Sequence, residues 1–416
     1  MDDQRTILLP TFGSSGDVNP FVTLGRELQR RGHEAILITN PYFRTQIEEA
    51  GLGFIGVGDE QDYLNAINDP DLWHTTRSFY MMARHAILGI MRPVYDVITQ
   101  FDPDRTLIAA PGIMFGAQLA HEANGFPYAT LQLQPSVFRS AHDTPVQGSM
   151  AFPGWTPAWL KRGWFNIIDR QVIDKTLGPE VNAFREELGL APVKHFFNEY
   201  IHSPQVSIGL FPDWFAPIQP DWPPQLALTG FIHAADNDTA LTAELEAFLA
   251  DGPSLVVFTA GSAMLLGESF FATAAEACAQ LGCRGLLVTR YQEQLPPDLP
   301  GNVLHVPFAP FDRLLPQAAA LVYHGGIGTM AQGLAAGIPH LVMPMGHDQP
   351  DNARRLERLG VGKTLLPKKF SAKRVAEVLD SLLSDDAVRI RCRELATRVD
   401  FVGALDATCD LILGLE

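Results

Sequence analysis

Cysteine, long apolar runs and positive charge are all scarce in this sequence. Four cysteines occur in 416 residues, and none of them belongs to a CxxC pair. This excludes a disulfide framework, and no His/Cys spacing typical of a metal site lies nearby. No apolar stretch approaches the roughly 20 residues that span a bilayer as a helix, and the N-terminal apolar run is too short for a signal peptide. We expect a cytoplasmic protein with reduced, buried thiols, and peripheral membrane contact stays open.

The charge balance narrows the class of partner. The chain has 31 Lys and Arg against 47 Asp and Glu, which gives a formal net charge of -16. A negative field disfavours a general nucleic-acid binder, although a local basic pocket for an anion stays compatible with it. The 416 residues, 46% of them hydrophobic, suffice for two or three domains with buried cores.

Short apolar runs alternate with amphipathic stretches in both halves of the chain. This β/α alternation predicts an α/β protein with two doubly wound, parallel-sheet domains of the Rossmann type. We place the first domain at 1–215, a linker at 216–240 and the second domain at 241–416, and leave open a return of the last helix to the first domain. The two domains would face each other across a cleft, with ligands at the carboxyl ends of the strands.

The stretch from residue 135 to 200 differs in kind from the rest. It carries Trp155, Trp159 and Trp164 among several prolines. We expect a long helical and irregular insertion that shapes an apolar pocket.

The strongest pattern is "LVYHGGIGTMAQGLAAGIPHLVMPMGHDQPDNA", residues 321–353. A buried strand ends before His324, glycines turn the chain, and a helix follows. A helix N-terminus offers free N–H groups and partial positive charge, and glycine lets a phosphate approach the backbone. His324 and Thr329 can donate to phosphate oxygens, while Asp348 and Gln349 follow the next strand and suit paired sugar hydroxyls.

This segment resembles the nucleotide-diphosphate-sugar signature of the GT-B glycosyltransferases of family 1. The resemblance implies that the donor diphosphate is bound by His324, Thr329 and the backbone around Gly326 and Gly328. It implies further contacts at other positions: Ser262 to the diphosphate, Phe308, Pro310 and Gln332 to the nucleoside, and Asp348 and Gln349 to the donor sugar. Two positions depart from plant members, which have Asn in place of Gly328 and a ribose-binding Glu in place of Gln332.

The loop "TFGSSGDVNP", residues 11–20, follows the first expected strand. Its glycines give only GxxG, so a dinucleotide-binding fingerprint is weak. The loop resembles that of the bacterial and sterol-transferring branch of the same family. There an Asp in the place of Asp17 is the proposed general base for the acceptor hydroxyl. The alternative interpretation is that Asp17 caps a helix beginning near Pro20.

Three further residues are candidates for the acceptor side. Ser14 and Ser15 project from the same loop as Asp17, and His142 lies in a loop after a later strand.

Segments of the middle, such as "RPVYDVI", "LQLQPSVFRSAH" and "HSPQVSIGLFPDWFAPIQPDWP", resemble the bacterial rhamnosyltransferases that form monorhamnolipid. This implies inverting, metal-independent transfer of L-rhamnose from dTDP-L-rhamnose to the hydroxyl of a 3-(3-hydroxyalkanoyloxy)alkanoic acid, giving a glycolipid. The nucleotide sugar would be a co-substrate, without any cofactor. Peripheral association of the protein with the inner face of the membrane and a partner protein that supplies the lipid both stay open.

No metal is expected, although three DxD triplets occur. They stand at 69–71, 102–104 and 236–238, all in turn-like contexts.

Alternatives of several classes stay open. The donor and acceptor could be UDP-glucose and a sterol, another lipid or a small hydrophobic natural product. A sugar-nucleotide epimerase or hydrolase would need its own acid/base set and no acceptor pocket. A non-catalytic nucleotide-sugar-binding subunit would be suggested by loss of Asp17 or of the diphosphate residues, and these are present.

Overall fold

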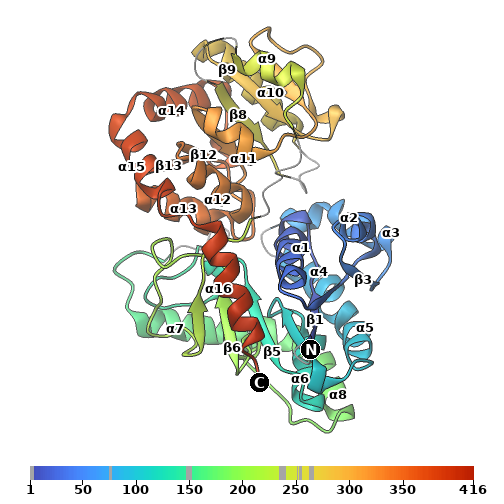
Figure 1. Ribbon diagram of the computed structural model, residues 1–416. Coiled ribbons are helices and arrows are strands. Elements are labelled where there is room, and N and C mark those ends of the chain that lie inside the picture. The colour runs from blue at the N-terminus through green and yellow to red at the C-terminus, as the bar shows by residue number, and fades with distance from the viewer. Residues whose placement is uncertain are drawn as a thin grey trace. The chain divides into compact units, whose positions relative to one another are not determined.

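The computed structural model describes residues 4–74, 77–146, 152–233, 240–250, 252, 255–261 and 267–416. The chain divides into two compact units. Unit 1 comprises Met1–Pro145, Ser149–Ile232 and Phe401–Glu416, and unit 2 comprises Val146–Gly148 and His233–Asp400. Each unit is built on one parallel sheet with helices around it (Figure 1), which confirms the predicted fold class.

Seven parallel strands form the sheet of unit 1, in the order β3-β2-β1-β4-β5-β6-β7. The strands are β1 (Thr6–Pro10), β2 (Glu34–Thr39), β3 (Gly53–Gly56), β4 (Thr106–Ala110), β5 (Tyr128–Gln132), β6 (Val206–Gly209) and β7 (Leu226–Leu228). The stretch predicted as a linker, 216–240, therefore includes an edge strand. Its backbone pairs with β6 from Ser207 to Gly209, so unit 1 continues beyond residue 215 to Ile232.

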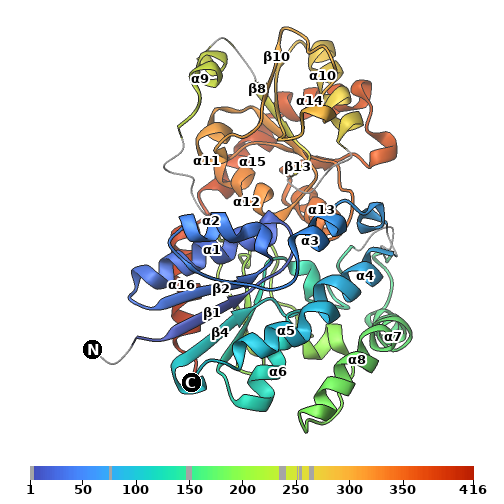
Figure 2. The same ribbon diagram turned by 90° about the vertical axis from the view of Figure 1, so that its right-hand side faces the viewer.

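The strands of unit 1 are apolar on both faces because helices cover both. Successive side chains of a strand point to opposite faces, so Leu8 joins one core while Ile7 and Leu9 join the other. The Leu8 core is closed by α5 (Gly89–Ile98), α6 (Phe115–Asn124) and α8 (Asp174–Glu187). The Ile7 core is closed by α1 (Ser15–Arg30), α2 (Arg44–Glu49) and α16 (Phe401–Leu413), and Figure 2 shows the two groups of helices on the two sides of the sheet.

The last helix, α16, belongs to unit 1 (red in Figure 1). Arg31, the C-cap of α1, donates to the carboxylates of Asp406 and Asp410 at 2.7 and 2.6 Å. The hydroxyl of Thr408 donates to that of Thr229 at 2.8 Å. These contacts fix the C-terminal helix beside the first helix of the chain.

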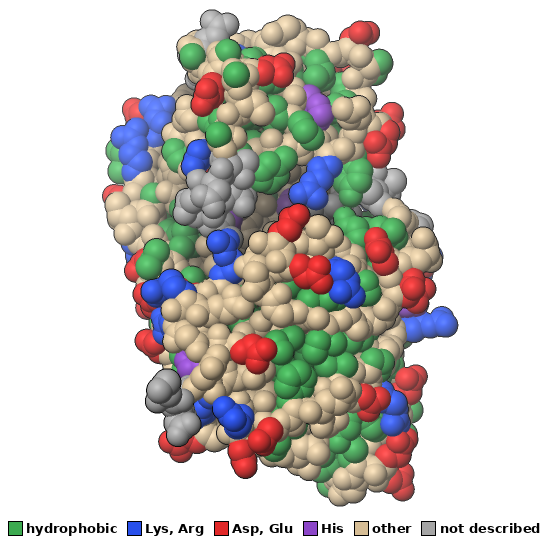
Figure 3. Space-filling model, turned by 45° about the vertical axis from the view of Figure 1, so that its right-hand side comes forward, with side chains coloured by type: hydrophobic (Ala, Val, Ile, Leu, Met, Phe, Trp, Pro, Cys, Tyr) green, Lys and Arg blue, Asp and Glu red, His purple; other side chains and the backbone are tan. Residues whose placement is uncertain are grey.

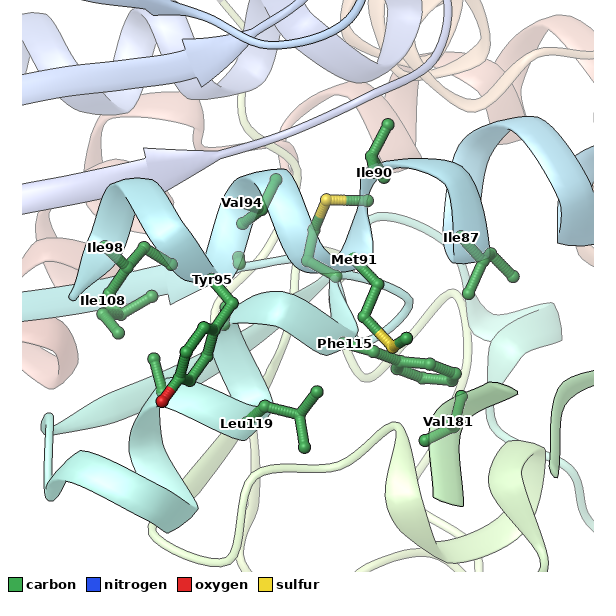
Figure 4. Close-up of a cluster of buried hydrophobic side chains, with 14 of the residues drawn as sticks. Ile87, Ile90, Met91, Val94, Tyr95, Ile98, Ile108, Phe115, Leu119 and Val181 are labelled. Carbon is green, nitrogen blue, oxygen red and sulfur yellow. The ribbon is translucent and has the colours of Figure 1, made fainter. Parts of the chain in front are cut away.

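Helices α5 and α6 pack through a glycine. Figure 4 shows Met91 of α5 directed toward Phe115 of α6, with Val181 of α8 close to the same ring. A Cβ on Gly116 would lie 2.4 Å from the carbonyl oxygen of Met91 and 2.8 Å from the amide nitrogen of Tyr95. The two helix backbones therefore approach more closely than any side chain at position 116 allows.

The remaining helices of unit 1 are α3 (Glu60–Ile67), α4 (Arg77–Met82) and α7 (Ala158–Ile168). A π-helical turn at Ala83–Leu88 lies between α4 and α5. Two more π-helical turns, at Asp169–Ile173 and Phe196–Tyr200, lie in the predicted insertion. Such turns admit an extra residue per turn and re-aim the side chains that follow.

Unit 2 has six parallel strands in the order β10-β9-β8-β11-β12-β13. They are β8 (Leu255–Thr259), β9 (Arg284–Val288), β10 (Val303–Val306), β11 (Ala320–Tyr323), β12 (His340–Val342) and β13 (Gly362–Thr364). The helices are α9 (Ala243–Ala250), α10 (Glu268–Leu281), α11 (Phe311–Leu314), α12 (Ile327–Ala336), α13 (Gln349–Leu359), α14 (Ala372–Ser384) and α15 (Asp386–Ala396).

The crossing of α5 and α6 gives a stability prediction. Gly116→Ala should destabilise unit 1 by about 1–3 kcal/mol, because the new methyl group meets the α5 backbone, which can yield only by shifting the helix. Guanidinium unfolding followed by circular dichroism measures the change.

Gly163→Ala is the matched control. Gly163 lies inside α7 with no atom within 4 Å of a built Cβ, so alanine there should be neutral or stabilising by about 0.5–1 kcal/mol. Equal midpoints for Gly116→Ala and the unsubstituted protein would contradict this account of the packing.

Candidate functional site

The site in unit 2 lies where the strand order reverses, between β8 and β11. Thr259 at the end of β8 is opposite Tyr323 at the end of β11. The segments that leave these strands, at Gly261 and His324, therefore emerge side by side at the carboxyl edge of the sheet. Such a reversal opens the crevice in which doubly wound sheets bind their ligands.

Two glycines enclose the imidazole of His324. A Cβ built on Gly261 would lie 2.6 Å from Cε1 of His324, and one built on Gly326 would lie 2.4 Å from its Nε2. Gly261 also has a φ of 88°, and Gly325 has a φ of 99°. At Gly261 and Gly326 a side chain would displace the ring. At Gly261 and Gly325 the backbone is left-handed, so glycine is favoured at all three positions.

The ring of His324 is neutral at physiological pH and incompletely hydrogen-bonded. Burial lowers the pKa of His324 to about 4, since desolvation disfavours the imidazolium. Its Nδ1 is buried and has no hydrogen-bond partner among the described residues. A buried polar atom without a partner is costly, and a ligand can satisfy it.

Helix α12 begins directly after this ring. Its N-cap is Gly326, which supplies no side-chain hydrogen bond to the first turn. A Cβ on Gly328 would meet no atom within 4 Å, so the backbone there is open to an approaching group, and Thr329 is half-buried beside it. The free N–H groups and the positive end of the helix dipole make this turn suited to an anion.

Asp348 and Gln349 follow β12 at the same edge of the sheet. Asp348 is the N-cap of α13 and accepts a hydrogen bond from Nδ2 of Asn352 at 2.6 Å. The side-chain oxygen of buried Gln349 accepts from the amide nitrogens of Met345 and Gly346 at 2.8 and 3.2 Å. Gln349 thus shapes the loop after β12 with its side-chain oxygen.

Asn352 is a site residue that the sequence predictions missed. It is fully buried, and its Nδ2 also donates to the carbonyl oxygen of Gly325 at 3.0 Å. One amide therefore joins the glycine turn after β11 to the carboxylate after β12. The spacing Asp348–Asn352, i and i+4 on a helix, places the two side chains on one face and was the available sign.

A small pocket of about 80 Å³ adjoins His324. Its lining is mainly apolar and comprises Ala260, Gly267, Ser269, Phe270, His324, Met343, Met345, Pro367 and Phe370. The rings of Phe270 and Phe370 are stacked with centroids 5.2 Å apart. The pocket therefore suits an apolar portion of a ligand whose polar portion lies at α12.

The predicted nucleoside contacts lie in the loop after β10 and on α12. Phe308 is 44% exposed, an unusual fraction for a phenylalanine. Pro310 is buried as the N-cap of α11. Gln332 donates weakly to the carbonyl oxygen of Gly328 at 3.4 Å. Ser262 lies outside the described residues.

The loop after β1 in unit 1 forms a capping box. Ser14 is the N-cap of α1, and its hydroxyl accepts from the amide of Gly16 at 3.2 Å. Asp17 accepts from the backbone N–H of Ser14 at 2.8 Å and from its hydroxyl at 3.0 Å. Asp17 is therefore a capping residue, as the alternative interpretation stated. The helix, however, begins at Ser15 rather than near Pro20, because the Ser14 side chain caps it earlier.

His142 follows β5 and is exposed. Its Nε2 lies 3.1 Å from a guanidinium nitrogen of Arg162 in α7. The structure thus brings His142 to α7, whereas Ser14, Ser15 and Asp17 stand together at the start of α1.

The described DxD triplets have a local role. Asp69 and Asp102 accept hydrogen bonds from the amides of Asp71 and Asp104 at 2.8 and 3.1 Å, and so cap short 3-10 turns. The third triplet, 236–238, lies outside the described residues. Within the described ranges, no group of three His, Cys, Asp or Glu could hold a metal ion, and no helix is both long and apolar enough to cross a membrane. On the face shown in Figure 3, acidic and basic side chains are mixed.

Two family models match the chain. The N-terminal domain of glycosyltransferase family 28 matches residues 7–142, and the C-terminal domain of the erythromycin biosynthesis protein CIII-like proteins matches residues 286–400.

Curated relatives align with most of the chain. It is 30% identical to glycosyltransferase GtfC of Amycolatopsis orientalis over 86% of this chain and 85% of that protein. It is 29% identical to O-mycaminosyltylonolide 6-deoxyallosyltransferase of Streptomyces fradiae, over 98% of this chain and 96% of the relative. The yeast sterol 3-beta-glucosyltransferase (Saccharomyces cerevisiae, strain YJM789) is 29% identical over 89% of this chain, which spans 32% of that longer protein.

Solved structures share the fold. The kitacinnamycin glycosyltransferase superposes with a TM-score of 0.74 at 21% identity, covering 98% of each chain. Glycosyltransferase VinC in complex with dTDP gives 0.70 at 20% identity, covering 98% of each chain. The spinosyn rhamnosyltransferase SpnG with thymidine diphosphate gives 0.69 at 17% identity, covering 98% of this chain and all of that one.

Three observations indicate the same family: the two parallel-sheet units, the crevice at α12, and the relatives that match along most of the chain. The protein therefore belongs to the family 1 glycosyltransferases of GT-B fold, which use a nucleotide sugar as donor.

Proposed function

We propose that the protein transfers a 6-deoxyhexose, with L-rhamnose from dTDP-L-rhamnose as the best candidate, to the hydroxyl of a lipid. The acceptor would be of the 3-(3-hydroxyalkanoyloxy)alkanoic acid type, and the product a glycolipid. The observation that carries the donor half is the crevice in unit 2, where neutral His324, with its unpaired Nδ1, adjoins the uncapped N-terminus of α12.

The diphosphate would lie against the first turn of α12. Backbone N–H groups there, the Thr329 hydroxyl and the single N–H of neutral His324 would donate to its oxygens. Gly326 and Gly328 give the close approach, and Ser262 is a further proposed donor. Half-exposed Phe308 would offer a ring face to the base, with Pro310 in the same loop, and Gln332 would hydrogen-bond the ribose.

The donor sugar would lie between the Asp348–Gln349 pair and the pocket beside His324. The carboxylate and amide suit ring hydroxyls, while Met343, Met345 and Phe370 suit a methyl group at C6. A C6 hydroxyl placed against these three apolar side chains would lose hydrogen bonds to water, which costs about 1–3 kcal/mol. Two relatives point the same way, since one acts with 6-deoxyallose and one solved neighbour is a rhamnosyltransferase holding thymidine diphosphate.

Asp17 is the proposed general base. Its carboxylate would take the proton of the acceptor hydroxyl as that oxygen attacks the anomeric carbon. The bond from the anomeric carbon to the diphosphate oxygen breaks on the opposite face, so the configuration inverts. The departing negative charge would be stabilised by the N-terminus of α12 and by His324. Ser14, Ser15 and His142 are proposed to line the acceptor side.

The alternative pair of substrates is UDP-glucose and a sterol, and the sterol 3-beta-glucosyltransferase relative supports its glucose and sterol parts. The same site would serve, because base, phosphates and ring hydroxyls use the same groups. The alternative differs at C6, where glucose carries a hydroxyl.

A matched pair of donors tests the proposal. The kcat/KM with dTDP-6-deoxy-D-glucose should exceed that with dTDP-D-glucose at least roughly tenfold, since the donors differ only at C6.

Across a panel of dTDP- and UDP-sugars, dTDP-L-rhamnose with a hydroxyacyloxy-fatty acid should give the highest kcat/KM, measured by mass spectrometry of the product. A preference for UDP-glucose and a sterol would replace the donor and acceptor assignment. Release of free sugar alone, unaffected by lipid, would indicate a hydrolase.

The role of His324 is tested by binding. His324→Ala should weaken dTDP binding about 10- to 100-fold, since a hydrogen bond to a charged group contributes about 1.5–3 kcal/mol. Because the pKa of His324 is lowered to about 4, affinity for an intact dTDP-sugar should stay flat from pH 8 to 6.5 and rise only toward acid, as imidazolium forms. Calorimetry measures both. His305→Ala is the control, because that ring bonds the carbonyl oxygen of Thr289 instead; equal losses for the two variants would disprove the assignment.

The base is tested by a change that keeps the cap. In Asp17→Asn the amide oxygen can still accept from Ser14, so helix α1 should persist, while kcat should fall about 10²–10⁴-fold with donor affinity within twofold. Asp59→Asn makes the same change at the N-cap of α3, where Asp59 accepts from the amides of Gln61 and Asp62. That control should retain kcat. An unchanged kcat in Asp17→Asn would leave the residue a structural cap only.

A further inference from the structure

Helix α7 and the turn before it carry an apolar surface that the rest of unit 1 leaves uncovered. Trp155 is 82% exposed, Trp159 71% and Trp164 44%, while Leu160 and Ile167 are 46% and 56% exposed. These five side chains are here called the α7 face. Three exposed tryptophans in ten residues form an apolar group of a kind that usually marks a contact site.

The α7 face is a continuous strip. At about 100° per residue, Trp159, Leu160, Trp164 and Ile167 fall within roughly 140° of the helix circumference. Trp155 lies in the turn that precedes the helix. Figures 1 and 2 both show α7 at the rim of unit 1 rather than under another helix.

The opposite side of the helix is fixed to unit 1. Asp169, which follows α7, is 1% exposed and pairs with Arg139. The ring of Phe165 contacts that of Phe152, with centroids 6.2 Å apart, and Arg139 lies 5.7 Å from its centroid. The α7 face therefore cannot rotate inward without breaking a buried ion pair.

The exposed charges of the stretch that carries the α7 face are mainly positive. Between residues 152 and 179 the exposed charged side chains are Arg162, Arg170 and Lys175, and exposed Glu180 follows directly. The two carboxylates of the stretch are engaged inward: Asp169 with Arg139, and Asp174 with the amides of His195 and Phe196. Arg162 also lies near His142 and 4.0 Å from Asp221. In a chain of net charge -16, this stretch is a local cationic exception.

We propose that the α7 face docks the protein on the surface of a bilayer that contains anionic lipid. Tryptophan prefers the interfacial level of a bilayer, with leucine and isoleucine inserting beside it. Arginine and lysine at the margin match anionic headgroups. A second copy of the chain is the less favoured occupant, because its α7 face would present the same cations. The proposal does not rest on the identity of the sugar donor or of the acceptor.

The test uses the intact protein and vesicles of phosphatidylcholine with or without about 30 mol% of the anionic lipid phosphatidylglycerol. Binding, followed by sedimentation and by a blue shift of tryptophan emission, should be at least roughly tenfold tighter with the anionic lipid. The combined variant Trp159→Ser/Trp164→Ser/Ile167→Ser should weaken binding at least roughly tenfold. Arg162→Glu/Arg170→Glu should remove the preference for anionic vesicles.

A matched control removes exposed apolar side chains elsewhere. Ile218, Ile390 and Val402 are 55%, 55% and 72% exposed, and their combined substitution by serine should leave vesicle binding within twofold. Thermal melting verifies that each variant is folded. The proposal is overturned if the unsubstituted protein does not bind vesicles or if the control loses as much binding as the α7 variant. It is also overturned if light scattering shows a dimer that the α7 variant abolishes while vesicles are not bound.

Discussion

The contact between Gly261 and the ring of His324 is the constraint on which the site in unit 2 depends. It exists because β8 and β11 pair with Thr259 opposite Tyr323, so the next residues of both strands leave the sheet together. A side chain at position 261 would push the ring away from the N-terminus of α12. The position of the imidazole is therefore set by strand register and by the absence of a Cβ. Because burial also keeps the ring neutral, it offers an N–H without adding a fixed charge.

The same crevice shows what the sequence could and could not reveal. Apolar runs such as "ILLP" predicted buried parallel strands, because helices on both faces require both faces to be apolar. The glycine turn after Tyr323 predicted an anion site, since its conformation is local. The bond from Asn352 to Gly325 was not predictable in this way, because it joins loops that only the β11–β12 pairing brings together. The π-helical turns were not predicted for a different reason, because their apolar pattern resembles that of an ordinary helix.

In unit 1 the carboxylate of Asp17 caps helix α1 and is also the proposed general base. Asp17 completes the capping box with Ser14, which holds its side chain in one orientation at the start of α1. A general base works best when it is already positioned, because no ordering then opposes the reaction. The cap thus supports the proposed proton transfer rather than excluding it. The sequence suggested both roles and could not choose, since capping and catalysis ask for the same residue type at the same turn.

The acidity of the chain does not oppose docking through α7. At physiological ionic strength, electrostatic interactions between exposed charges fade beyond about 8 Å. An approaching anionic surface therefore meets chiefly the local charges, which here include Arg162, with Asp221 4.0 Å from it, and Arg170 and Lys175 of the same stretch. Charges far from the contact are screened by salt, so the charges near the tryptophans dominate the interaction with the bilayer surface. The inward ion pair of Asp169 with Arg139 matters for the same reason, because it withdraws from this surface a carboxylate that would otherwise cancel one of these cations.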